Sequence, residues 1–143
     1  MKQHIKAIFL AALALIGSCS AYVIAEYNEA LDHGASELQT KVDTFLNDLE
    51  QHAGAPEAEY ERNSGFYEEV RGDISVLREA ASEHRGNDIT IKSLGLIADN
   101  VDKLERMHAE GISAEEIAIV RTLFDTQFRM LIQFENAKKR KEG

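Results

Sequence analysis

The sequence predicts an all-α fold: an antiparallel up-down bundle of four helices that follows an apolar N-terminal helix. Apolar residues recur at alternating spacings of three and four along most of the chain, which is the period of helices that pack on one another. The 143 residues include a single proline and no convincing strand pattern, which excludes a sandwich or barrel of many strands and turns. A chain of this length fits one domain.

The first amphipathic helix is predicted to run from Leu31 to about His52, because Gly54 and Pro56 follow as stop signals. Gly34 disfavours a helix by about 1 kcal/mol relative to alanine, and residues 36–39 resemble a helix-capping sequence. We therefore expect a kink or a restart near this point. The predicted core positions are Leu31, Ala35, Leu38, Val42, Phe45 and Leu49.

The second helix is predicted to begin either at Pro56 or after the turn-like sequence at 63–65, and to end before Arg85. Its predicted core positions are Tyr67, Val70, Ile74, Leu77 and Ala81. The third helix follows a cap at residues 87–88. Its predicted core positions are Leu94, Ile97, Val101, Leu104 and His108.

The connection to the fourth helix carries the clearest local signal. Gly111 can adopt the left-handed conformation that ends a helix, and Ser113 with Glu116 forms a capping box. So short a connection requires antiparallel neighbours. The fourth helix is predicted to pack through Ile117, Val120, Phe124, Phe128, Leu131 and Phe134. Leu123 and Ile132 widen this stripe, as expected for a central helix or for one that binds a partner.

An uncharged segment of 19 residues, from Ala7 to Ala25, lies between Lys6 and Glu26. Within it, Ile16-Gly17-Ser18-Cys19 resembles the lipobox of bacterial lipoproteins, an aliphatic residue and two small residues before the cysteine that is lipidated. The resemblance implies that residues 1–18 are a signal peptide and that Cys19, the chain's only cysteine, carries the lipid. Because Ser20 rather than an aspartate follows, the resemblance also implies sorting to the outer membrane.

Two other interpretations of this segment remain open. Residues 5–25 are long enough for an uncleaved transmembrane anchor, because about 20 apolar residues span a bilayer. The segment also fits an ordinary cleaved signal peptide. All three interpretations place residues 19–143, the predicted bundle domain, outside the cytoplasm, facing the periplasm of the bacterial cell envelope. An inner-membrane single-span protein is thus the alternative to an outer-membrane lipoprotein.

The composition argues against several classes of function. A net charge of −9 disfavours nucleic acid as a partner. The sequence contains no phosphate-binding glycine loop and no hydrolase motif, so we expect no enzymatic activity and no cofactor. Glu105 and His108 form a single Glu-x-x-His, a weak candidate for a metal site, since di-iron bundles use two such motifs and two further glutamates.

Charge is segregated along the chain. Residues 26–69 hold 12 acidic residues but only two basic ones, Lys41 and Arg62. Near the C-terminus, four consecutive basic residues are candidates for contact with anionic lipid head groups or other envelope polyanions, namely Lys138, Lys139, Arg140 and Lys141. We therefore expect a membrane-tethered, non-enzymatic interaction or structural module with a protein partner. The alternatives are a metal- or cofactor-binding bundle and a ligand-sensing domain that works through a partner.

Overall fold

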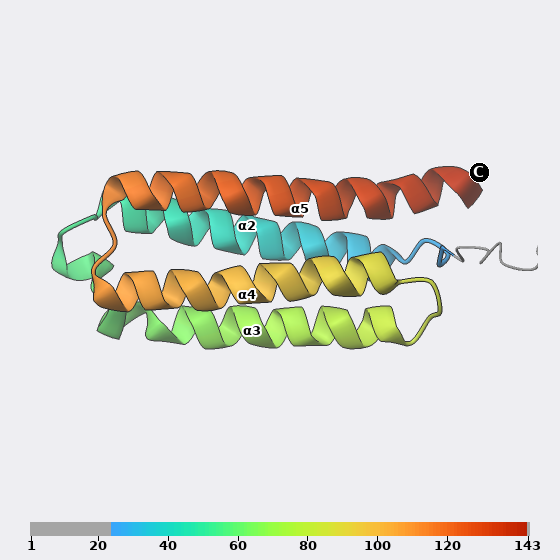
Figure 1. Ribbon diagram of the computed structural model, residues 1–143, viewed down its shortest axis with the longest axis horizontal. Helices are drawn as coiled ribbons and strands as arrows, with labels where there is room; N and C mark the ends of the chain where they lie inside the picture. The colour runs from blue at the N-terminus through green and yellow to red at the C-terminus, as the bar shows by residue number, and fades with distance from the viewer. Residues whose placement is uncertain (1–23, 143) are drawn as a thin grey trace, which may run out of the picture.

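The computed structural model describes residues 24–142, which form four long antiparallel helices and one short 3₁₀ helix, with no strand in that range. The long helices are α2 (Glu29–Gln51), α3 (Tyr60–Ser82), α4 (Asp88–Glu110) and α5 (Ala114–Glu142), and the 3₁₀ helix is η1 (Pro56–Ala58). The predicted all-α, up-down four-helix bundle is confirmed (Figure 1). The predicted apolar helix that precedes it falls largely on residues 1–23, outside the described range.

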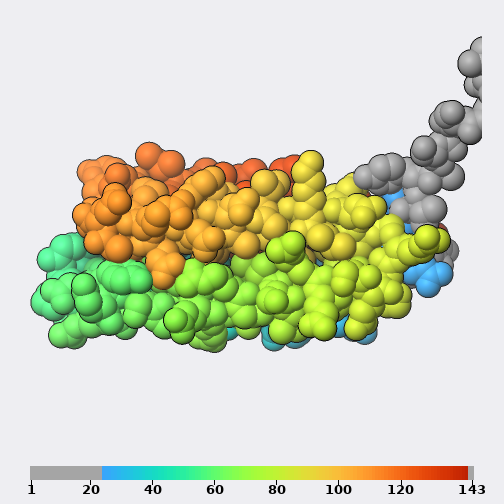
Figure 2. Space-filling model, turned by 60° about the horizontal axis from the view of Figure 1, so that its bottom comes forward, coloured from blue at the N-terminus to red at the C-terminus, as the bar shows by residue number. Residues whose placement is uncertain are grey.

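The helices follow one another around the bundle, so that α3 and α4 each pack against both sequence neighbours, and α5 closes the ring against α2. The α2–α5 and α3–α4 pairs are the most extensive contacts, and Figure 2 shows α3 and α4 side by side along their length. We call the end that holds residue 24, the α3–α4 turn and the last residues of α5 the tip end. The opposite end, which holds η1, is the η1 end (Figure 1).

The core consists of the apolar stripes of the four helices, and nearly all the predicted core positions are buried. Two predictions were wrong. Leu46 rather than Phe45 lies fully in the core, and Glu135 replaces Phe134 at the far end of α5. The face of a straight α-helix rotates by about 20° per heptad relative to a strict seven-residue repeat. Over several turns, the residue that points into the core therefore shifts to the next position in the sequence. Phe45 instead stacks on Phe66 at the side of the core, with ring centroids 3.7 Å apart.

Helix α2 is continuous through Gly34, so the expected kink or restart is absent. The Ser36 hydroxyl donates to the Asp32 carbonyl within the helix, at 2.9 Å, instead of capping a new one. Packing explains why a glycine stands at position 34, because a Cβ there would lie 2.5 Å from Cδ2 of Leu77 on α3. The glycine allows the Leu77 side chain to lie directly against the backbone of α2.

Helix α3 begins at Tyr60, after η1, so neither predicted start was correct. The turn-like residues 63–65 lie inside the helix. Asn63 supports the start of α3, because its side-chain amide donates to the carbonyls of Glu57 and Glu59 at 2.9 and 2.8 Å. A residue type that favours turns is thus used here to hold the connection against the first turn of the helix.

The α4–α5 connection has the predicted geometry. Gly111 ends α4 with a φ of +96°, in the left-handed region. The Ser113 backbone N–H donates to the Glu116 carboxylate at 2.8 Å, and the Glu116 N–H donates to the Ser113 hydroxyl at 3.3 Å. The predicted capping box is confirmed. Ile117, four residues after the cap, is completely buried.

Within residues 24–142, no helix combines the length and the apolar character that crossing a membrane requires. The lipobox at 16–19 and most of the alternative anchor at 5–25 lie outside the described residues.

Candidate functional site

A buried polar cluster lies at the tip end, where α5 meets the start of α4. We call it the Lys138 cluster, and its members are Asn87, Thr90, Glu135 and Lys138, each at most 2% exposed. The Lys138 ammonium donates to both Glu135 carboxylate oxygens at 2.9 Å and to the Asn87 side-chain oxygen at 2.7 Å. The Thr90 hydroxyl donates to Glu135 and lies 3.2 Å from the ammonium.

This cluster corrects one of the sequence-predicted contact residues. Lys138 is 2% exposed, so its charge is neutralised inside the bundle and is not offered to an external polyanion. Asn87 also donates to the Ala81 carbonyl at 2.8 Å, which links the end of α3 to the cluster. The exposed basic residues at the tip end of α5 are Lys139, Arg140 and Lys141.

The second buried polar group is His108, near the end of α4 and 4% exposed. Its Nε2 lies 2.7 Å from the Ala58 carbonyl oxygen, and its Nδ1 lies 2.7 Å from the Tyr67 hydroxyl. A carbonyl can only accept, so Nε2 donates to Ala58. The two contacts orient the imidazole and attach η1 to α3 and α4.

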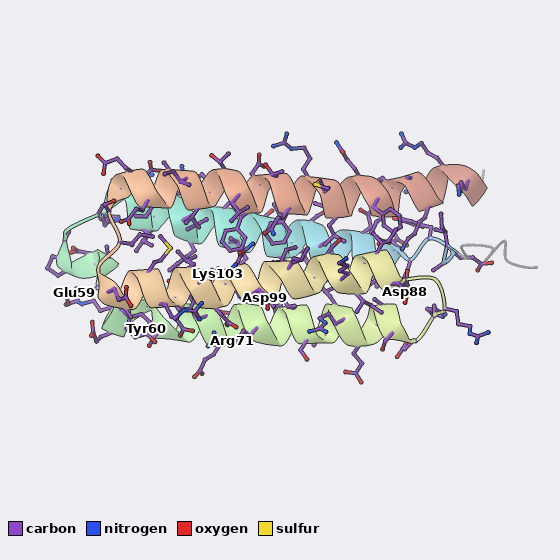
Figure 3. All side chains as sticks on the ribbon, in the orientation of Figure 1. Glu59, Tyr60, Arg71, Asp88, Asp99 and Lys103 are labelled. Atoms are coloured by element: carbon purple, nitrogen blue, oxygen red, sulfur yellow. The ribbon has the colours of Figure 1, made fainter. Side chains whose placement is uncertain are left out.

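An ion-pair network lies on the α3–α4 flank, and Figure 3 labels two of its members, Tyr60 and Arg71. Arg71 contacts Glu105 at 2.6 Å and Asp102 at 3.1 Å, and the Tyr60 hydroxyl donates to Glu105 at 3.1 Å. The Arg71 guanidinium, and secondarily the Tyr60 hydroxyl, hold the pKa of the Glu105 carboxyl below its usual range. Burial raises the pKa of the Tyr67 phenol, which therefore stays a hydrogen-bond donor.

The structure does not bring Glu105 and His108 together as metal ligands. The carboxylate is engaged by Arg71 and Tyr60, and both imidazole nitrogens have partners. Across residues 24–142, no three His, Cys, Asp or Glu side chains are grouped so that they could hold a metal ion.

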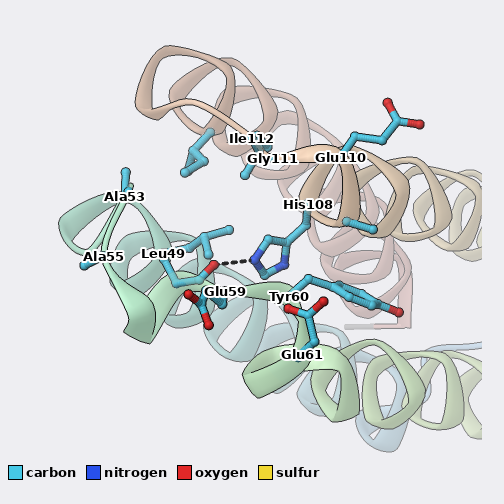
Figure 4. A pocket seen from close by; sticks show the side chains of 14 residues that line it. Leu49, Ala53, Ala55, Glu59, Tyr60, Glu61, His108, Glu110, Gly111 and Ile112 are labelled. Carbon is cyan, nitrogen blue, oxygen red and sulfur yellow. Dashed lines mark hydrogen bonds between the residues drawn. The ribbon is translucent and has the colours of Figure 1, made fainter.

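A pocket of about 350 Å³ lies at the η1 end, beside His108 (Figure 4). Its wall combines apolar side chains such as Leu49 and Ile112 with the carboxylates of Glu59 and Glu61. Because both nitrogens of His108 are already hydrogen-bonded, the imidazole offers this pocket no free base.

Large apolar side chains are exposed on α5 and on α4. Ile119, Leu123 and Met130 of α5 are 70%, 44% and 67% exposed, and Leu96 of α4 is 50% exposed. We call these four residues the apolar row. A hydrophobic side chain that stays this exposed gains only part of its burial energy from the bundle, and a group of them is typical of a surface that binds a partner.

Hydrogen bonds and ion pairs place the apolar row along one groove. Arg121 contacts Asp43 and Glu50, so that flank of α5 faces α2. At 100° per residue, Leu123 and Met130 lie on the opposite flank, toward α4. The Thr90–Glu135 hydrogen bond sets the antiparallel register of α4 and α5, which brings Leu96 level with Met130. The row therefore follows the α4–α5 groove.

The sequence pattern had marked Leu123 and Ile132 as additions to the α5 stripe. The structure separates them: Ile132 is partly buried against the core, whereas Leu123 is exposed. The Lys138 cluster was missed, although a signal for it was present. The spacing of three and four continues from Leu131 to Glu135 and Lys138, and it continues backward from Leu94 to Thr90 and Asn87.

Comparisons with known proteins do not assign the chain to a family. The chain matches no protein-family model, and searches of curated proteins and of solved structures gave no significant match.

The Lys138 cluster predicts a non-additive pair of substitutions. Lys138→Met leaves the Glu135 carboxylate buried and unpaired, so we expect a loss of about 3–5 kcal/mol in the free energy of unfolding. Adding Glu135→Met should recover most of that loss, because the double variant buries no charge. Urea denaturation measures the two single variants, Lys138→Met and Glu135→Met, and the double variant, with the exposed Lys139→Met as the control. Additive losses in the double variant would contradict the geometry.

Because the Tyr67 hydroxyl is hydrogen-bonded to buried His108, we expect its removal to lower the free energy of unfolding. Tyr67→Phe leaves Nδ1 of buried His108 without its hydrogen-bond partner, and we expect a loss of about 1–3 kcal/mol in the free energy of unfolding. Tyr60→Phe is the matched control, because its acceptor Glu105 keeps the Arg71 ion pair. Urea denaturation of both variants checks this, and equal losses would argue against a special role for the Tyr67–His108 contact.

Proposed function

We propose that this chain is a membrane-tethered protein of the bacterial cell envelope that acts as a non-enzymatic protein-interaction module. The apolar row carries the proposal, because it exposes four large hydrophobic side chains along α4 and α5, whereas α3 exposes a single one, Val76. The polar groups that chemistry would need are engaged within the described bundle: His108, Glu105 and Lys138 all have internal partners. These features support partner binding better than catalysis.

The charge distribution supports the same proposal. The exposed side of α2 and α3 is rich in carboxylates, and Lys41 bridges Glu69 and Asp73 at 2.6 Å. The apolar row lies across the bundle, along α4 and α5. One flank therefore favours solvent, and the other offers hydrophobic area to a partner helix.

The tether is proposed from the N-terminal sequence. The lipobox-like residues 16–19 favour a lipoprotein that is lipidated on Cys19 and sorted to the outer membrane. The inner-membrane anchor at 5–25 is the alternative. In both arrangements the bundle faces the periplasm.

The mass of the mature N-terminus tests the tether. For a lipoprotein, we expect a chain that begins at Cys19 and carries a diacylglyceryl group and an added acyl chain. Metabolic labelling with palmitate should then be lost in Cys19→Ser and retained in Ser20→Ala, the matched control. An intact Met1 without lipid would replace the lipoprotein with the transmembrane anchor. A lipid-free N-terminus within residues 19–30 would overturn the tether.

Site-specific photocrosslinking from Ile119 in intact cells tests the interaction surface. We expect a discrete protein adduct whose yield falls at least fivefold in Leu123→Glu/Met130→Glu, because two carboxylates in a hydrophobic contact are costly to desolvate. The double variant Ser75→Glu/Val76→Glu adds the same charge to the exposed side of α3 and should leave the yield unchanged. The proposal fails if no adduct forms, or if both variants lower the yield equally.

A further inference from the structure

We infer that Lys139, Arg140 and Lys141 form a docking surface for anionic phospholipid head groups and hold the tip end of the bundle against the membrane. We call these three residues the basic tip. The inference rests on the proposed function, because it takes the membrane tether to precede residue 24. It identifies which end of the bundle meets the membrane and by what chemistry.

The fold places the basic tip at the end where the chain enters the bundle. The segment that leads into α2 and the last turn of α5 lie at the same end in Figure 1. The Ala25 N–H donates to the Gly86 carbonyl at 3.2 Å, which holds the entering chain against the α3–α4 turn. From Cys19 to the first residue of α2 there are only ten residues, at most about 35 Å of extended chain. A tether at either predicted position therefore keeps the tip end close to the lipid.

The basic tip also projects beyond the acidic residues of this end. Lys139 lies 5.1 Å from the centroid of the Tyr27 ring, which precedes the first residue of α2. Lys138 already contacts Asn87, which precedes the first residue of α4. The residues after Lys138 therefore extend past the first turns of both neighbours, where acidic residues interact with the helix dipoles. These acids are Glu29, Asp32 and Asp88.

Three further charges lie at this end, in the entering segment and in the α3–α4 turn. Glu26 and Glu83 are acidic, and Arg85 is basic. Together with the basic tip, four basic residues there stand against these two acidic ones. The basic tip therefore supplies the positive excess beyond the first turns of α2 and α4.

The Lys138 cluster makes this surface rigid. Lys138 and Glu135 are buried and hydrogen-bonded to α4 and to the residue before it, so the last turns of α5 are fixed to the bundle. A basic helix end that is held in place presents its charges together, without the entropic cost of ordering a free tail. A single buried lysine thereby positions the three exposed basic residues that follow it.

The expected strength suits a tethered contact. Each basic residue near an anionic membrane surface favours the docked state by about fivefold, so three favour it by roughly a hundredfold. A hundredfold preference gives only weak membrane binding to a protein that is free in solution. A short tether makes docking intramolecular and raises its effective concentration. The attraction should fall steeply with salt, because the Debye length shortens from about 8 Å at physiological ionic strength to about 3 Å at 1 M.

Energy transfer from a single indole tests docking in the full chain. The sequence has no tryptophan, so Glu142→Trp introduces the only indole, next to the basic tip. The protein is reconstituted into phosphatidylcholine vesicles with or without 30% phosphatidylglycerol, each carrying the same trace of dansyl-labelled lipid, roughly one head group in a hundred. We expect at least twofold greater transfer in the anionic vesicles at low salt, and we expect 1 M salt to abolish the difference.

Two matched triple variants, each made in the Glu142→Trp protein, identify the residues that dock on the anionic lipid. Lys139→Gln/Arg140→Gln/Lys141→Gln should remove the difference between the two kinds of vesicle. Arg62→Gln/Lys103→Gln/Arg106→Gln removes the same charge from exposed positions away from the tip end and should retain the difference. Lys103 lies on α4, away from the tip end (Figure 3).

The outcomes separate this inference from the proposed tether. Flotation with pure phosphatidylcholine vesicles after a high-salt wash reports the tether alone, because no anionic lipid is present. Equal transfer in both kinds of vesicle overturns the inference even when the protein floats, and so does a difference that both triple variants lose. Greater transfer only on vesicles that carry lipopolysaccharide, and not on phosphatidylglycerol vesicles, would assign the basic tip to a saccharide polyanion and overturn the phospholipid assignment.

Discussion

Each of the four helices of this protein has a single apolar stripe, and none can bury that stripe alone. Mutual burial of the stripes is the interaction on which the rest of the structure depends, because helices of this length gain most of their stability from packing. The antiparallel order follows from short connections, such as the glycine and capping box between α4 and α5. With the core filled along the whole axis, the ends and the outer surface are left to carry function.

The two polar clusters occupy the two ends of that core. At the tip end, the Lys138 cluster joins α5 to the start of α4. At the η1 end, His108 joins η1 to α3 and α4. Each uses hydrogen bonds that are directional, whereas apolar packing alone allows helices to slide by a turn. A buried ion pair adds little net stability, and its best attested use is to specify register. Here it also fixes the helix end that carries the basic tip.

Much of the fold could be predicted because its signals are local or periodic. Spacings of three and four locate the core positions, and Gly111 with Ser113 and Glu116 defines a helix boundary through contacts among near neighbours. The errors arose where periodicity and local propensity are ambiguous. Leu46 replaced Phe45 because the helical repeat drifts, and Gly34 was taken for a weak point although it makes room for Leu77. Lys138 was expected at the surface because charge usually indicates exposure, and its partners Asn87 and Thr90 lie about 50 residues away.

The sequence by itself determined the helical class, the positions of most core residues, the α4–α5 connection and the separation of acidic and basic residues along the chain. Each of these depends on the order of residues within one or two helical turns. Only the tertiary structure decided that Lys138 is paired with Glu135, that His108 is hydrogen-bonded to both Tyr67 and Ala58, and that Leu96 lies level with Met130. The physical reason is that burial and pairing are properties of neighbouring helices. The same charged or apolar side chain has opposite consequences depending on whether a second helix covers it.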